Sequence, residues 1–216
     1  MSEVDRDRRR LIQWSVGALA LPLFASEGVA RAAVFGGAGE RLALSAAVFD
    51  RRFPAGPVFA SALEARGVQA LGFAGDITPA WKGLIEPAWR GGSAVLAGLT
   101  CERNLACLVE LARDYRMHVV LLARHRAVAG EGVRTRIYGP TGLRGEIAAL
   151  PAAPALSWPE QAARLAMRVP AAGSRDRVGQ FRSRGNGADI EAPLFSWVIA
   201  PIRPHSRSIQ VPEVAI

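Results

Sequence analysis

The sequence predicts an α/β fold: an open, mainly parallel sheet of about four to five strands with flanking helices. From about residue 42 to residue 125, continuous apolar runs of strand length alternate with helical patterns, as expected of repeated βα units. Strands that are apolar along their whole length indicate a parallel sheet buried on both faces. Half of the residues are apolar and 21% are charged, so the chain can bury one proper core.

The regular region is expected to contain four strands and three helices. The strands are expected at residues 42–49, 68–73, 93–97 and 117–123. The helices are expected at residues 58–66, 78–89 and 101–115. Thr78 is the expected N-cap of the second helix, with Pro79 at its first position. Trp81 and Trp89 belong to the apolar stripe of that helix and are interpreted as core, and Pro87 is expected to kink or end it.

The remainder of the chain is less regular. Further strands are expected at residues 133–138 and 194–200, with a turn at 139–142 after the first of them. Ser157 with Glu160 three residues later predicts a capping box for a helix over 158–168. Residues 170–190 are rich in Gly, Arg and Ser, which favours a mobile loop. The last residues, 204–216, are expected to form a tail.

The first 32 residues have the composition of an export signal. Charged residues ending in Arg8, Arg9 and Arg10 precede an apolar run of about 15 residues, and small residues ending in Ala30 and Ala32 follow it. This order resembles a bacterial twin-arginine (Tat) signal peptide, a receptor-read address. The resemblance implies a periplasmic or secreted protein that the Tat translocase exports.

Two features of this segment leave alternatives open. Asp7 and Gln13 stand where the Tat pattern usually has other residues, so the general secretion route remains open. The apolar run is shorter than the roughly 20 residues of a membrane-spanning helix, but an uncleaved leader would tie the protein to a membrane. With cleavage after Ala32, residues 33–41 form a linker and residues 42–203 form a single domain.

The positive charge of the chain comes almost entirely from arginine. The formal net charge is +8, and Lys82 is the only lysine. The arginines of the domain are scattered along the sequence, and an exported protein seldom meets nucleic acid. We therefore predict that the chain does not bind nucleic acid.

Polar residues are expected where the strands end. In an open parallel sheet, ligands bind outside the carboxyl ends of the strands. The predicted ends of the four strands place seven residues at this edge, which are Asp50, Arg51, Asp76, Thr78, Thr100, Cys101 and His125. The group matches no named signature, and it includes four candidate ligand-binding residues, which are Asp50, Arg51, Thr78 and Thr100.

A catalytic interpretation centres on Cys101. If Thr100 is the N-cap of the next helix, the helix dipole favours a Cys101 thiolate. His125 is then a candidate general base, oriented by Asp76 or Asp50. The alternative is that Cys101 is a small residue in a turn, His125 lies on the surface and Asp76 caps a helix. The loop from Asp50 through Arg52 is either salt-bridged or an anion site.

Other chemistry has little support in the sequence. The three histidines lack the spacing of metal ligands, so no metal site is predicted. No cofactor motif is present in the expected position, and no cofactor is predicted. Cys101 and Cys107 are expected to be free thiols, because a separation of six residues on one helix places the two sulfur atoms on different faces and too far apart for a disulfide. Cys107 is expected to lie in the core.

Three functions follow as hypotheses. The first is an exported binding or accessory protein of the cell envelope, with a co-exported protein partner docked by the apolar segment 194–200 and the tail. The second is a small hydrolase or transferase that uses Cys101 with His125. The third is a domain that binds a small anionic ligand near Arg51, Asp76 and Thr100.

Overall fold

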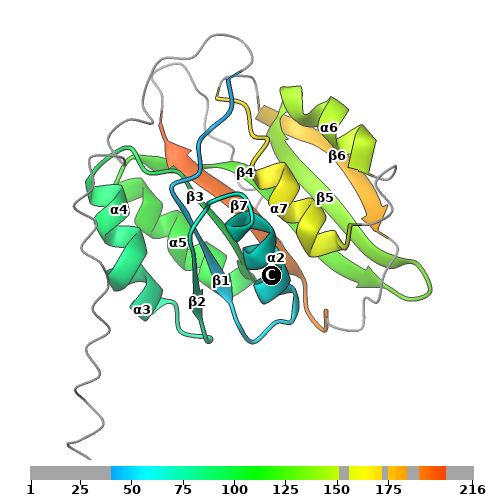
Figure 1. The fold of residues 1–216 in the computed structure, drawn as a ribbon, viewed down its shortest axis with the longest axis horizontal. Helices are drawn as coiled ribbons and strands as arrows, with labels where there is room; N and C mark the ends of the chain where they lie inside the picture. Colours follow the sequence, from blue (N-terminus) through cyan, green and yellow to red (C-terminus); the bar gives the residue numbers. More distant parts are fainter. Residues whose placement is uncertain (1–39, 151–155, 172–174, 184–189, 203–216) are drawn as a thin grey trace, which may run out of the picture.

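A computed structural model describes residues 40–150, 156–171, 175–183 and 190–202, and they form a mixed α/β fold (Figure 1). One sheet contains all seven strands, which are β1 (Ala46–Asp50), β2 (Ala70–Phe73), β3 (Leu96–Cys101), β4 (Met117–Val128), β5 (Gly132–Pro140), β6 (Arg175–Ser183) and β7 (Leu194–Pro201). The helices are α2 (Ala55–Glu64), α3 (Thr78–Ala80), α4 (Glu86–Arg90), α5 (Glu102–Asp114), α6 (Arg144–Ala149) and α7 (Trp158–Ala166). The leader, the linker up to residue 39 and the tail lie outside the described residues.

The sheet is larger than predicted, and it is mixed rather than mainly parallel. Its strand order is β2-β1-β3-β7-β4-β5-β6. Only β1 pairs in parallel, with β2 on one side and β3 on the other. The other four pairings, from β3 through β7, β4 and β5 to β6, are antiparallel. A strand that is apolar on both faces fits the centre of either kind of sheet, so its pattern did not reveal the direction of its neighbours.

The last described strand causes most of this difference. β7 lies between β3 and β4, so the fourth predicted strand does not lie next to the third. All residues of β7 except its last are buried. The prediction that the segment 194–200 docks a partner is therefore wrong, because this segment is the centre of the sheet.

Two predictions for the second half need correction. The segment 170–190, interpreted as a mobile loop, contains the edge strand β6, whose Val178 and Phe181 are buried. The fourth strand does not end near residue 123 but continues to Val128 and forms a long hairpin with β5. The abundance of glycine and arginine concealed β6, because an edge strand needs apolar residues on one face only.

Several local predictions are confirmed. Ser157 and Glu160 form the capping box at the start of α7. The second helix was expected to have Thr78 as its N-cap, but the N-cap is Ile77, and Thr78 is the first helical residue. The helix continues through a π-helical segment, Trp81–Ile85, into α4, where Pro87 occupies the first turn and does not end it. Trp89 is buried in the core, and Trp81 packs edge-on against it with ring centroids 5.7 Å apart.

Helices cover both faces of the sheet. One apolar cluster joins the sheet to α2, α6 and α7, and it includes Phe59, Ile147 and Ala163. The second cluster joins the other face to α4 and α5, and it includes Trp89 and Leu108. Figure 1 shows α2, α6 and α7 in front of the sheet, with α5 passing behind it.

The close packing of the sheet centre requires a glycine. Gly98 on β3 lies opposite Trp197 on β7, and Trp197 is fully buried. A Cβ atom at position 98 would lie well within the contact distance of the Trp197 indole ring. The indole therefore packs close against the β3 backbone at Gly98, and its NH donates a hydrogen bond of 3.1 Å to the hydroxyl of Thr100.

Candidate functional site

The parallel half of the sheet contains a topological switch point. The chain leaves β1 toward α2, on one face of the sheet, and leaves the neighbouring strand β3 toward α5, on the other face. The connections that follow β1 and β3 thus run to opposite faces of the sheet. Open α/β sheets bind ligands in the crevice that such a divergence leaves at the carboxyl ends of the two strands. Asp50 ends β1 and Cys101 ends β3, so the predicted edge exists for this part of the sheet.

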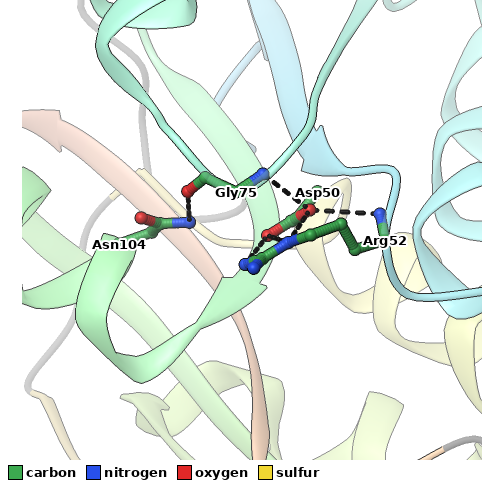
Figure 2. Close-up of polar contacts among 4 residues, drawn as sticks. All are labelled: Asp50, Arg52, Gly75 and Asn104. Carbon is green, nitrogen blue, oxygen red and sulfur yellow. Dashed lines mark hydrogen bonds and ion pairs between the residues drawn. The ribbon is translucent and has the colours of Figure 1, made fainter.

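Asp50 is the buried centre of this edge, and Figure 2 shows its contacts. Its carboxylate accepts hydrogen bonds from Arg52, at 3.1 Å from the backbone N–H and at 2.7 Å from the guanidinium Nη2. It also accepts a bond of 3.3 Å from the backbone N–H of Gly75. The Asp50 side chain is 0% exposed, whereas 51% of the Arg52 side chain is exposed. The salt-bridged interpretation of this loop is therefore confirmed.

The pKa of the Asp50 carboxyl lies below its ordinary value. Burial is the largest influence and alone would raise this pKa, but the hydrogen bonds from Arg52 and Gly75 together outweigh it. The hydrogen bond to Asp50 is in turn the main cause of the raised pKa of Arg52. The pair therefore stays ionised and holds the loop after β1 in one conformation.

The loops after β1 and β2 and the first turn of α5 are joined at Gly75. Asn104 of α5 is buried and donates a hydrogen bond of 3.2 Å to the Gly75 carbonyl oxygen (Figure 2). Gly75 has a φ of +76°, which favours glycine. A Cβ atom there would also meet the Arg52 guanidinium at 3.2 Å.

The structure places Thr100 and Cys101 differently from the prediction. Thr100 lies inside β3 and is fully buried, and its hydroxyl accepts the bond from Trp197, so it is neither an N-cap nor accessible to a ligand. Cys101 is the N-cap residue of α5 and is half-buried. Arg52, rather than His125, interacts with the Cys101 sulfur. Cys107 is exposed instead of buried, and both thiols are free.

His125 is not at the edge of the sheet. It lies inside β4 and is fully buried, with ring nitrogens 2.9 Å from the hydroxyls of Thr135 and Ser196. Its ring also lies 4.6 Å from the Trp158 ring, centroid to centroid. Burial lowers its pKa to about 3. Cys101 and His125 both lie opposite Leu194, so their backbones are two strand spacings, about 10 Å, apart.

Arg51 and Asp76 border a pocket at the outer end of this edge, whereas Thr78 is exposed but is not among the residues that line it. The volume of the pocket is about 340 Å³, and its lining residues are Arg51, Leu71, Gly72, Phe73, Ala74, Asp76, Pro79 and Ala80. Asp76 is exposed and accepts a hydrogen bond of 2.9 Å from the Thr78 backbone N–H. This bond and one from the Thr78 side chain lower the pKa of Asp76. The capping interpretation of Asp76 is thus confirmed, and the residue still faces the pocket.

Among the described residues, no group of three or more His, Cys, Asp or Glu side chains is placed to hold a metal ion. No helix in the described ranges is long and apolar enough to cross a membrane.

Known proteins offer no guide to the function. No family model, curated protein or solved structure matches the chain. The function must therefore be argued from the residues at this edge.

Sequence reasoning missed two residues that organise the edge. Arg52, which the sequence indicates only as part of a charged loop, pairs with Asp50, and Asn104, which no motif indicates, bonds to Gly75. The signal for Asn104 was a polar residue on the apolar face of α5, beside Leu105 and Leu108. A polar residue at a core position indicates a specific hydrogen bond, because burial without a partner is costly.

Proposed function

We propose that the chain is an exported protein that binds a small carboxylate ligand in the pocket bordered by Arg51 and Asp76. The observation that supports this proposal most strongly is the position of these two opposite charges in one pocket at the carboxyl edge of the parallel strands. A volume of about 340 Å³ is within the size range of small-molecule sites.

The charges of the pocket specify the ligand. Arg51 is exposed and takes part in no ion pair within the described ranges, whereas Arg52 is held by Asp50. A free guanidinium binds carboxylate through two parallel hydrogen bonds. The Asp76 carboxylate, which only accepts hydrogen bonds, requires a donor. A hydroxy acid or an amino acid supplies both groups.

Binding is favoured over hydrolysis by the environment of Cys101. A catalytic thiol needs a base within hydrogen-bond reach. Both ring nitrogens of His125 are within 2.9 Å of hydroxyl groups on β5 and β7, and burial keeps the ring neutral. The residue beside the thiol is Arg52, which cannot accept a proton.

Calorimetric titration with malate and succinate tests the ligand class. The two acids differ by one hydroxyl group, so malate should bind more tightly if Asp76 accepts a bond from that group. Arg51→Ala should weaken malate binding about tenfold or more, since a hydrogen bond to a charged group contributes about 1.5–3 kcal/mol. Arg66→Ala is the matched control, because Arg66 is exposed on another part of the surface. Equal binding by both arginine variants would contradict the proposal.

The location outside the cytoplasm rests on the leader. In a bacterial host with an active Tat system, we expect the mature protein in the periplasm to begin at Ala33. Replacing Arg8 and Arg9 with lysine should retain the full-length precursor in the cytoplasm. Intact mass measurement of the fractions checks both results. Undiminished export of the variant would favour the general secretion route, and a membrane-bound full-length chain would show an uncleaved anchor.

A further inference from the structure

Arginines that are scattered in the sequence gather on one face of the antiparallel half of the sheet. Arg124 lies opposite Arg136 and Arg126 lies opposite Arg134 on the paired strands β4 and β5. Arg134 also lies opposite Arg182 on β6. Residues directly opposite on antiparallel strands point to the same face. We call these five residues the arginine face.

The arginine face is turned away from α6 and α7. Side chains alternate along a strand, and the residues between these arginines are buried on the side of those two helices. Val133, Ile137 and Phe181 belong to the apolar cluster that includes α6 and α7. The arginines therefore project from the opposite side, where Arg126, Arg136 and Arg182 are exposed.

Acidic side chains do not balance this charge. Glu131, in the turn between β4 and β5, forms ion pairs with Arg134 at 3.2 Å and with Arg182 at 2.9 Å. Arg124, Arg126 and Arg136 take part in no ion pair within the described ranges. Within the part of the chain that the structure describes, five guanidinium groups thus share one carboxylate, although like charges opposite each other destabilise a strand pair.

Four of these residues surround a single small pocket. The pocket has a volume of about 40 Å³ and is lined by Arg124, Arg126, Arg134 and Arg136. Arg124 is fixed over the Phe195 ring, with its guanidinium carbon 5.9 Å from the ring centroid. Its Nε atom is buried and has no hydrogen-bond partner among the described residues. Buried donors without a partner are rare in folded proteins, and an acceptor bound in this pocket would satisfy the Arg124 Nε atom.

We propose that the arginine face binds the phosphoryl group of a small soluble molecule in this pocket. Three of the four lining arginines, Arg124, Arg126 and Arg136, form no ion pair within the described residues, and arginine binds the acceptor oxygens of a dianion through paired hydrogen bonds. The volume has room for about three water molecules, which is the size of one phosphoryl group. Four of the five arginines line one small pocket on two paired strands, so a nucleic acid or a membrane surface, which needs an extended charged surface, fits less well.

Calorimetric titration of the full domain with pyrophosphate tests this site. We expect saturable binding that weakens with added salt, and Arg136→Gln should raise the dissociation constant about tenfold or more. Arg66→Gln removes one positive charge from another surface, and it should alter the dissociation constant for pyrophosphate less than about twofold. Arg51→Ala should leave pyrophosphate affinity unchanged, which separates this site from the carboxylate pocket.

The folded state of the variant needs its own measurement. Arg136 is exposed and opposes another arginine, so Arg136→Gln should unfold at the same temperature as the unchanged protein or a higher one. Equal pyrophosphate affinity in the Arg136 and Arg66 variants would overturn the proposal. It would also be overturned if pyrophosphate fails to saturate while phosphatidylglycerol vesicles or a DNA oligonucleotide bind.

Discussion

Acidification from pH 6.5 to pH 4.5 should lower the free energy of unfolding by about 2 kcal/mol through His125 alone. The pKa of the buried ring is about 3, against an ordinary value of 6.5. Between these values the unfolded chain binds a proton that the folded chain excludes. This contribution to stability is therefore complete only well above pH 6.5 and is lost as pH falls toward 3, at up to about 1.4 kcal/mol per pH unit between the two pKa values.

Chemical denaturation at a series of pH values measures this effect. His125→Gln keeps a neutral hydrogen-bonding side chain between Thr135 and Ser196, and it has no group that titrates in this range. The variant should be less stable at pH 7.5, because the contact with Trp158 is lost. Its stability should change less between pH 6.5 and pH 4.5 than that of the unchanged protein. Identical slopes in the two proteins would show that His125 becomes protonated in the folded state.

Arg52→Ala should lower the free energy of unfolding by about 3 kcal/mol at pH 7, because it leaves the Asp50 charge buried without its partner. Arg51→Ala is the matched control. It removes the same charge from the adjacent, exposed position, and a surface change of this kind is usually worth less than about 0.5 kcal/mol. Urea denaturation compares the two variants.

The contribution of Asp50 to the pH dependence of the free energy of unfolding should also change sign in the Arg52→Ala variant. In the unchanged protein the pKa of Asp50 lies below 3.8, so its contribution is present above pH 3.8 and lost as pH falls through the folded value. Without the Arg52 side chain, we expect burial, the largest single influence on this pKa, to outweigh the two backbone hydrogen bonds that remain and to raise the pKa above 3.8. The variant should then lose stability as pH rises above that value. A variant that keeps the acid sensitivity of the parent would mean that backbone amides alone stabilise the charge.

Local features were predictable from the sequence where they depend on a few neighbouring side chains. The capping box at Ser157 and the start of the helix at Thr78 depend on residues within one turn. The parallel β1, β2 and β3 followed from apolar runs separated by helices. The position of β7 was not predictable, because its partners lie about 95 residues and 75 residues earlier in the chain, and its apolar pattern fits any central strand.

The residues of the candidate site were predictable only where they depend on a recognised strand end and not on the pairing of distant strands. Asp50 and Asp76 were placed correctly, since they follow strands whose ends were recognised. His125 was misplaced because β4 continues beyond its apolar half, and a buried histidine is interpretable only with Thr135 and Ser196 in view. The arginine face depends on the register of β4, β5 and β6, so spacing along the chain concealed it.

Mapping malate onto the protein by ¹H–¹⁵N NMR tests the central claim, that the Arg51 pocket is the ligand site. We expect saturable shifts in the backbone amides of Arg51, Gly72 and Asp76, which border the pocket, and their loss in Arg51→Ala. Shifts confined to Cys101 and Leu194, or none that saturate, would contradict the account.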